Sequence, residues 1–293
     1  MLSILIPTKD YECRNLVETL HRQGTALGRP FEIIVGEDGS SPRGLSFNAP
    51  LAQLPHCRII AQQQNVGRAR IRNILAQEAR GKDILFIDSD AVAEHGDILQ
   101  LYSQALAESP VVCGGLYHPE APLTSSCTLR HRYERAADKH RSAKERSRAP
   151  YDKFTTFCFA IRRELFLDIK FDERIINYGY EDTIFGYELR RRGVPVKHID
   201  APLMHIGLES NKVYLAKVEE SLRTLTQLEE TIAPTALLRF YNRLKKWHLT
   251  SITAAAWRAL RLILRVNLLG RHPSLTLLNI YKIGYYCNLR RLS

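Results

Sequence analysis

The stretch I-L-F-I-D-S-D-A over residues 84–91 places two carboxylates, Asp88 and Asp90, directly after four apolar residues. Like charges this close repel each other, unless a cation lies between them or water screens them at a surface turn. Hard divalent cations such as Mg²⁺ and Mn²⁺ prefer carboxylate oxygens and keep coordination positions open for phosphates. The pattern is therefore compatible with an exposed turn or with a metal site that binds a diphosphate.

A second pair of acids, Glu181 and Asp182, precedes a predicted short helix that ends in three arginines and Gly193. Acids at the start of a helix and bases at its end complement the helix dipole, so a purely structural role is one interpretation. A carboxylate at the floor of a cleft could instead act as a general base toward a hydroxyl group. The sequence leaves both interpretations open.

Two further groups could contribute to an anion or metal site. His205 lies beyond a predicted strand over residues 196–200. A single histidine is more often structural, but it could serve as a metal ligand if the site already contains carboxylates. Gly67 opens a predicted helix over residues 67–80 that carries Arg68, Arg70 and Arg72 near its start, and Arg70 is the selected candidate. Arginine opposes the dipole there, so these residues either bind a nucleotide or diphosphate or form a solvated face.

Short apolar runs alternate with segments of helical period through the first hundred residues. Because strands that alternate with helices form parallel sheets with right-handed crossovers, we expect helices on both faces of such a sheet. Ligands bind at the carboxyl ends of the strands in these sheets. Three predicted strands end in polar residues, which are Thr8, then Glu37 and Asp38, then Asp88 and Asp90. The predicted strands cover 3–7, 57–62 and 82–90, together with a strand that ends in a turn within 31–40, and the predicted helices cover 14–23 and 67–80.

The second half of the chain has a mixed pattern. Residues 111–118 and 154–166 are predicted strands, and residues 211–230 form a predicted amphipathic helix. The segment 128–150 between the two strands is polar and mostly basic. It is either a solvated helix or mobile loop, or a lid that closes over an anionic substrate.

All of the excess positive charge lies at the C-terminal end of the chain. Residues 231–293 contain eleven Lys and Arg and no Asp or Glu, whereas the preceding residues contain 31 of each sign. We therefore expect a catalytic domain over residues 1–232 and a basic, amphipathic helical region over residues 233–293. Within residues 235–269, Trp257, Leu260, Ile263 and Leu264 follow a helical period and are expected to share one apolar side, so this segment suits an anionic membrane surface. Alternatively, their apolar side packs on the catalytic domain; a nucleic-acid partner is not expected.

The six cysteines are scattered and form no CxxC pair. This argues against a zinc cluster or a disulfide framework and suits a reducing compartment. The apolar run at the start of the chain is too short for a signal peptide, and no run of about eighteen uncharged apolar residues predicts a membrane span. We expect a cytoplasmic protein that binds peripherally to the inner face of the cell membrane.

Six segments in this order resemble the family 2 glycosyltransferases. The resemblance covers about residues 1–210 and implies the GT-A fold, a Rossmann-like, mostly parallel α/β sheet with helices on both faces. It also implies inverting transfer from a nucleotide sugar. The segments are S-I-L-I-P-T-K-D-Y-E-C-R-N-L-V-E-T-L, F-E-I-I-V-G-E-D-G-S, Q-N-V-G-R-A-R-I-R-N-I-L-A-Q-E-A-R-G-K-D-I-L-F-I-D-S-D-A, V-V-C-G-G-L-Y, F-T-T-F-C-F-A-I-R-R-E-L-F and F-D-E-R-I-I-N-Y-G-Y-E-D-T-I-F-G-Y-E-L-R-R-R-G.

The resemblance assigns donor-site roles to four residues. Thr8 and Asp38 match positions that hold the nucleoside base, usually uracil. Asp88 and Asp90 match the DxD motif, which binds the ribose, the diphosphate and a divalent metal, Mn²⁺ or Mg²⁺. The family's D-D-G-S is E-D-G-S here, with Glu37 in place of the first Asp, which leaves the choice of base open.

The resemblance also assigns the acceptor side of the reaction. Asp182 matches the catalytic base of the ED motif, with Glu181 beside it toward the acceptor. His205 fits a metal-ligating histidine that some GT-A enzymes have after this motif. The processive signature Q-x-x-R-W is absent, so we expect transfer of one sugar rather than polymerisation.

The predicted function is therefore a metal-dependent, inverting hexosyltransferase. It would move a sugar from a UDP sugar to a hydroxyl of a lipid-linked saccharide or a precursor of lipopolysaccharide or surface polysaccharide. One alternative is a sugar-nucleotide nucleotidyltransferase, but I-P-T-K-D-Y-E-C-R-N lacks the Gly-rich loop that such an enzyme needs after its first strand. Another is a catalytically dead scaffold at the membrane, against which the intact Asp88, Asp90 and Asp182 argue.

Overall fold

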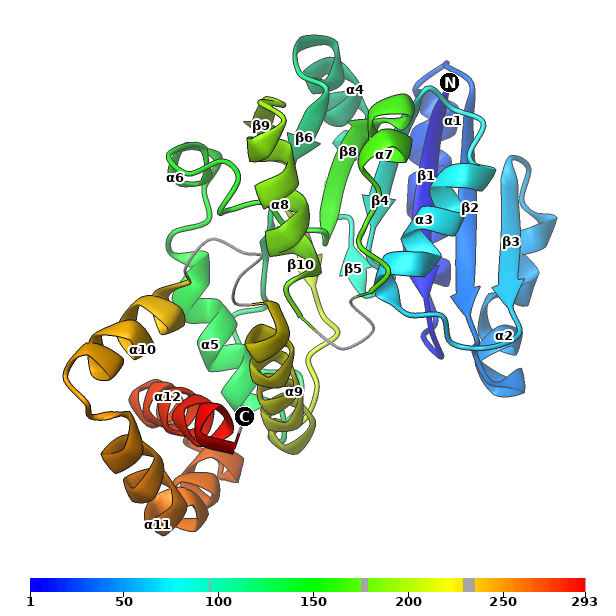
Figure 1. Ribbon diagram of the computed structural model, residues 1–293. Helices are drawn as coiled ribbons and strands as arrows, with labels where there is room; N and C mark the ends of the chain where they lie inside the picture. Colours follow the sequence, from blue (N-terminus) through cyan, green and yellow to red (C-terminus); the bar gives the residue numbers. More distant parts are fainter. Residues whose placement is uncertain (95, 175–178, 229–234, 293) are drawn as a thin grey trace. The chain divides into compact units, whose positions relative to one another are not determined.

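The computed structural model describes every residue except 95, 175–178, 229–234 and 293 (Figure 1). The chain divides into two compact units, which are described separately. As far as their residues are described, the first comprises Met1–His118, Asp138–Ile176 and Glu181–Gly207, and the second Pro119–Ala137, Asn177–Tyr180 and Leu208–Ser293. The predicted domain boundary at 232 and 233 lies outside the described residues.

Seven strands form the main sheet of the first unit, in the order β3-β2-β1-β4-β8-β6-β9. All of them run parallel except β8, which is antiparallel to both of its neighbours. This mostly parallel sheet confirms the predicted α/β class. The strands are β1 (Leu2–Thr8), β2 (Phe31–Asp38), β3 (Cys57–Gln62), β4 (Asp83–Ile87), β6 (Val111–Cys113), β8 (Cys158–Arg162) and β9 (Val196–His198).

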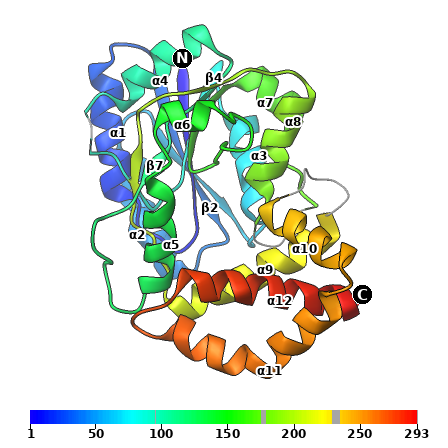
Figure 2. The same cartoon turned by 90° about the vertical axis from the view of Figure 1, so that its left-hand side faces the viewer.

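Helices cover both faces of this sheet, because its strands are apolar on both sides. Figure 2 shows α1 and α4 on one side and α3, α7 and α8 on the other. Burial follows the helical period: Leu16, Val17 and Leu20 of α1 all face the sheet. The helices are α1 (Arg14–Ala26), α2 (Pro42–Asn48), α3 (Arg68–Glu78), α4 (Ile98–Glu108), α6 (Ala143–Ser147), α7 (Arg163–Ile169) and α8 (Glu181–Arg191), with a 3₁₀ turn at Ala49–Gln53.

A smaller sheet brings two distant segments together beside the end of β4. It has three strands in the order β5-β10-β7. The register pairs His205 of β10 with Ala91 of β5, the residue that follows Asp90. This pairing positions His205 next to the Asp-Ser-Asp segment. The strands are β5 (Ala91–Val92), β7 (Leu116–Tyr117) and β10 (Leu203–His205).

The basic segment 128–150 forms α5 (Thr128–Asp138) and α6. Arg146 of α6 is buried and donates hydrogen bonds to the carbonyl oxygens of Gly114 and Ile199, at 3.0 and 2.7 Å. This end of the segment is therefore anchored to the first unit, and the interpretation as a fully solvated helix or mobile loop does not hold for it.

The second unit consists of helices. Helix α12 packs against α9, α10 and α11. None of the helices among the described residues is both long enough and apolar enough to cross a bilayer. Besides most of α5, the helices of the second unit are α9 (Asn211–Leu228), α10 (Ala236–Lys246), α11 (Thr250–Leu269) and α12 (Leu275–Leu292).

The turn after β2 depends on a glycine. Gly39 has a φ of +63°, a conformation that costs other residues strain. A Cβ atom on Gly39 would also lie 2.2 Å from the backbone nitrogen of Asn65. Gly28 has the same φ, but a Cβ atom there would meet nothing within 4 Å.

We predict that Gly39→Ala destabilises the protein far more than Gly28→Ala. Gly28→Ala should cost about 1 kcal/mol of unfolding free energy because only the backbone is strained. Gly39→Ala should cost at least about 2 kcal/mol more because its methyl group displaces the neighbouring loop. Urea denaturation of both variants measures the difference, and equal losses would show that the loop yields freely.

Candidate active site

The first two strands end in residues that shape the loops above the sheet. Thr8 is buried, and its hydroxyl donates to the carbonyl oxygen of Tyr11 at 3.2 Å. Asp38 accepts hydrogen bonds from the backbone N–H groups of Val66 and Gly67, at 2.6 and 3.1 Å. The structure thus brings two predicted site residues, Asp38 and Gly67, into direct contact.

Glu37, where the family has aspartate, has a structural role within the fold. Its carboxylate is buried and accepts hydrogen bonds from Ser40 Oγ at 2.5 Å and Asn48 Nδ2 at 2.8 Å. Asn48 also accepts a hydrogen bond from the backbone N–H of Cys13 at 3.0 Å. The carboxylate of Glu37 therefore ties the loop after β2 to the end of α2 and, through Asn48, to the start of α1.

Asp88 pairs with Arg72 of α3, which had been considered as a nucleotide or diphosphate contact. The Nη2 atom of Arg72 lies 2.5 Å from Asp88 Oδ1, and the Arg72 side chain is only 2% exposed. Its guanidinium group also lies 5.9 Å from the centre of the Phe171 ring. Burial raises the pKa of Asp88, and the charge of Arg72 opposes that rise. A buried carboxylate needs such a partner, which explains an arginine in the first half of α3.

Arg68 connects this site to the second acid pair. Its Nη1 atom lies 3.8 Å from Glu181 Oε1. Its positive charge also favours the ionised forms of Asp88 and Asp90. Arg70, the predicted nucleotide contact, instead has a 58% exposed side chain that lies 3.7 Å from the carboxylate of Glu173.

Asp182 lies in the first turn of α8. Burial and the nearby charge of Glu181 raise the pKa of Asp182 to about 6. The backbone N–H of Thr183 donates to its carboxylate at 2.7 Å, which limits the rise. A carboxylate with a pKa of about 6 is a stronger base than an ordinary aspartate and is still ionised at neutral pH.

Asp90 begins a chain of hydrogen-bonding side chains. Asp90 Oδ2 lies 3.0 Å from His205 Nε2, and His205 Nδ1 lies 3.0 Å from His118 Nε2. His118 Nδ1 in turn lies 3.1 Å from Asp138 Oδ1. Arg141 donates to the same Asp138 oxygen at 2.7 Å. The chain thus runs from one carboxylate through two imidazole rings to a second carboxylate.

The chain contains three contacts, but two neutral histidines supply only two N–H protons. Both ends are carboxylates, which accept hydrogen bonds and do not donate them when ionised. Burial would raise the pKa values of Asp90 and Asp138, but hydrogen bonds with their histidine partners and nearby positive charges hold both below the usual value. One contact therefore needs a positive charge in place of a proton. At the Asp138 end Arg141 supplies one, because its Nη1 atom lies 3.4 Å from His118 Nδ1; at the Asp90 end a third proton or a metal cation could do so.

The Asp90 end of the chain is the more accessible one. The Asp90 side chain is 25% exposed, against 9% for Asp138. Asp138 is held further by the backbone N–H of His118, at 3.1 Å. If both imidazoles donate toward Asp138, the Nε2 lone pair of His205 faces Asp90, and the two present one nitrogen and one oxygen to a cation.

The three predicted metal ligands are not assembled around one point. Among the residues that the structure describes, no three His, Cys, Asp or Glu side chains are placed to hold a metal ion together. Asp90 and His205 are in contact, whereas Asp88 Oδ1 faces Arg72. A carboxylate with an imidazole is a donor set that suits Mn²⁺, and substrate oxygens commonly complete such sites. Asp90 and His205 therefore fit a divalent cation.

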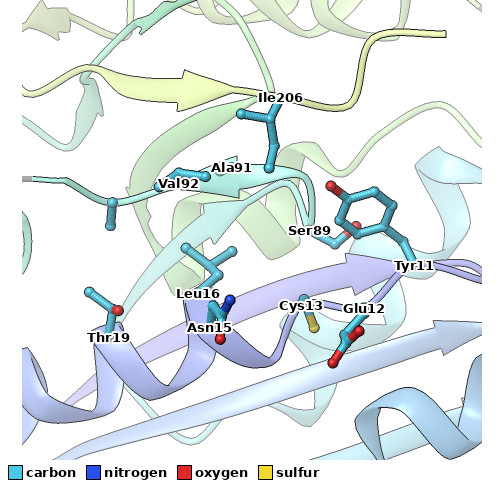
Figure 3. Close-up of a pocket in the computed structure, with 11 residues that line it drawn as sticks. Tyr11, Glu12, Cys13, Asn15, Leu16, Thr19, Ser89, Ala91, Val92 and Ile206 are labelled. Carbon is cyan, nitrogen blue, oxygen red and sulfur yellow. The ribbon is translucent and has the colours of Figure 1, made fainter. Parts of the chain in front are cut away.

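A pocket of about 180 Å³ lies beside the Asp-Ser-Asp segment. Figure 3 shows Tyr11 and Ser89 at one end of this pocket. Burial and the charge of Asp90 raise the pKa of Tyr11. Pockets that enclose whole small ligands usually measure about 300–1,000 Å³, so this one is too small to enclose a nucleotide sugar.

A protein-family model described as glycosyl transferase family 2 matches residues 3–169 of this chain. The chain belongs to glycosyl transferase family 2. This confirms the resemblance that was predicted from the sequence motifs, and the protein is a glycosyltransferase. No sequence among the curated proteins matches the chain.

Solved structures support the fold of this family 2 glycosyltransferase. Mannosyltransferase PcManGT from Pyrobaculum calidifontis, in complex with GDP-Man and Mn²⁺, has a TM-score of 0.57 and 14% identity, over 100% of this chain and 88% of that one. A structure of S. aureus TarS comprising residues 1–349 has a TM-score of 0.52 and 16% identity, over 100% of this chain and 92% of that one. At these identities the likeness establishes the GT-A fold.

Sequence reasoning missed His118, Asp138 and Arg141. They lie 87, 67 and 64 positions from His205 in the chain, so no short-range spacing pointed to them. One feature of the sequence could have pointed to His118. His118 directly follows the short strand β7, as Asp88 follows β4, and polar residues beyond strand ends had been selected elsewhere.

We predict that Arg72→Met destabilises this glycosyltransferase by about 3 kcal/mol, because it leaves Asp88 without its partner in a largely buried site. Arg70→Met, on the same helix, should change stability by no more than about 0.5 kcal/mol because Arg70 is exposed. Urea denaturation measures both. Asp88→Asn should recover part of the loss in the Arg72→Met background, and equal stability of the two arginine variants would contradict the assignment.

Proposed function

We propose that this glycosyltransferase transfers one hexosyl group from a nucleotide sugar, with UDP as the expected nucleotide, to a hydroxyl of a saccharide acceptor, with inversion at the anomeric carbon. The observation that carries the proposal is the approach of His205 Nε2 to Asp90 Oδ2, because one nitrogen and one oxygen at this distance would suit a cation at the end of β4. The similar mannosyltransferase is described with GDP-Man and Mn²⁺, which supports this class of donor and a divalent metal.

Asp90 and His205 would hold the cation, with Mn²⁺ or Mg²⁺ as the expected ions. When bound, a divalent cation neutralises the negative charge that develops on the leaving diphosphate. His118 and Asp138 would orient the His205 ring. Metal-ligating histidines commonly have such hydrogen-bonded partners, which fix the ring and its tautomer.

Asp88 would bind the donor rather than the metal directly. Its Oδ1 atom is held by Arg72, and its side chain is still 23% exposed. A carboxylate fixed in this way can accept a hydrogen bond from a ribose hydroxyl through its other oxygen. Arg68, whose side chain is 53% exposed, would meet the diphosphate. Thr8, Asp38 and the loop at Gly67 would border the base.

Asp182 would act as the general base. It takes the proton from the acceptor hydroxyl as that oxygen attacks the anomeric carbon, and the bond to the diphosphate oxygen breaks on the opposite face. The electron pair of the broken bond leaves with the nucleoside diphosphate. A single displacement of this kind inverts the anomeric centre. Glu181 would help by raising the pKa of Asp182 and by facing the acceptor.

Hydrolysis of the donor, with water as the acceptor, should follow the ionisation of Asp182. Because the base must be deprotonated and its pKa is raised to about 6, the rate should increase with pH through about 6 and then level off. Glu181→Gln removes one cause of the raised pKa, so its midpoint should move to lower pH. Release of nucleoside diphosphate from a panel of UDP and GDP sugars with Mn²⁺ provides the measurement.

Asp182→Asn is the stricter test of the same assignment. It should abolish donor hydrolysis and leave donor affinity, measured by calorimetry, unchanged. Loss of donor affinity would reassign Asp182 to the donor site. No release from any nucleotide sugar would favour the catalytically dead scaffold instead.

Mn²⁺ affinity tests the hydrogen-bond chain without any need for activity. His118→Ala should weaken binding about 10–100-fold because the His205 ring loses its support. His118→Gln should retain more Mn²⁺ affinity than His118→Ala, because the amide oxygen of the glutamine can accept a hydrogen bond from His205 Nδ1–H. His198→Gln is the matched control: His198 is buried and bonds Arg146 and the Pro150 carbonyl, away from Asp90.

Free Mn²⁺ is counted by electron paramagnetic resonance in the presence of UDP. Equal affinities for the wild type and His118→Ala would show that His118 has only a structural role. Absence of Mn²⁺ binding by the wild type itself would contradict the cation site.

A further inference from the structure

Helix α11 carries apolar residues on two opposite faces. Ala254, Trp257, Leu264 and Leu268 are buried and form its inner face. Gly284 of α12 allows close packing there, because a Cβ atom on it would lie 2.6 Å from Trp257 Cβ. The inner face therefore completes the helical core of the second unit.

The outer face of α11 is apolar but exposed. Ile252, Leu262, Ile263 and Val266 are 65%, 69%, 68% and 75% exposed. At about 100° per residue, the exposed apolar residues of the helix cover roughly half of its circumference, without one charged residue. We call this surface the α11 outer face. Its members are Ile252, Ala255, Ala256, Ala259, Leu260, Leu262, Ile263, Val266 and Leu269.

This arrangement revises the prediction for the helix. Trp257, Leu260, Ile263 and Leu264 had been expected to share one apolar side. In the structure, Trp257 and Leu264 lie in the core, whereas Leu260 and Ile263 are exposed. One face of α11 therefore packs on the protein, and the opposite face is exposed and available to a partner.

Exposed aromatic residues and bases accompany the α11 outer face. Trp247, just before α11, is 65% exposed, and Phe240 of α10 is 48% exposed. Trp and basic residues are typical of the boundary between water and lipid. Arg243, Lys245 and Lys246 occupy the last turn of α10, and residues 231–293 contain no acid to neutralise them.

We infer that the α11 outer face docks the enzyme on an anionic phospholipid bilayer, with α11 lying in the plane of the interface. A continuous apolar face of this width would enter the acyl boundary, and the bases would meet anionic headgroups. A second copy of the chain is a poorer fit, because it would bring two acid-free, basic regions together. A nucleic acid would leave the apolar face uncovered.

The inference goes beyond the proposed transfer reaction and suits an acceptor saccharide that is carried on a lipid. Each of the bases near the interface should contribute about fivefold to bilayer affinity at low salt. Burial of each exposed Ile, Leu or Val side chain of the α11 outer face should contribute about tenfold or more. Affinity should therefore fall with added salt, but not to zero.

Vesicle flotation of the full chain tests the inference. The wild type should float with phosphatidylcholine–phosphatidylglycerol vesicles and only weakly with phosphatidylcholine alone. Ile263→Asp with Val266→Asp should reduce binding at least about tenfold. Val213→Asp is the matched control, since Val213 is an exposed apolar residue of α9 in the same unit, 45% exposed. It should float like the wild type.

Wild-type protein that stays unbound, or a double variant that floats as well as the wild type, would overturn the inference. So would a dimer that the double variant dissociates while neither protein floats, because the occupant would then be a second copy. The substituted side chains are exposed, so melting temperature and donor hydrolysis should not change. Loss of flotation with hydrolysis intact separates this inference from the proposed transfer reaction.

Discussion

The contact between Asp90 and His205 is the interaction on which the proposed cation site at the end of β4 depends. Three contacts share two imidazole protons in the chain that runs through His118 to Asp138, so one contact needs a positive charge in place of a proton. Arg141 can supply that charge at the Asp138 end, and a bound cation could supply it at the Asp90 end. We propose the cation at the Asp90 end because that carboxylate is the more accessible of the two. Charge on a diphosphate would then be neutralised where the parallel strands end, which is where ligands bind in sheets of this type.

The fold brings this site together from segments far apart in the sequence. Pairing of β10 with β5 places His205 beside Asp90, 115 positions earlier. Helix α3 packs on the sheet so that Arg72 reaches Asp88, and the start of the same helix carries Arg68 toward Glu181. Two carboxylates after one strand are tolerated because each has its own positive or hydrogen-bonding partner.

Much of this could be predicted from local patterns, and the rest could not for definable reasons. Alternating apolar runs predicted the strands and the mostly parallel sheet, and Asp90 and His205 were selected and do meet. The partner of Asp88 depends on how α3 packs across the sheet, which periodicity does not specify. His118 and Asp138 meet only through the tertiary fold. On α11, both faces are apolar, so the period alone could not tell which one packs and which is exposed.

The most direct test of the cation site is pulsed electron paramagnetic resonance of Mn²⁺ bound to the enzyme with UDP. Nitrogen nuclei within bonding distance of the metal modulate its signal. The site described here predicts modulation from a single imidazole nitrogen that disappears in His205→Gln. A wild-type spectrum without nitrogen modulation, or one that His205→Gln leaves unchanged, would contradict the assignment of His205 and Asp90 as the metal-binding pair.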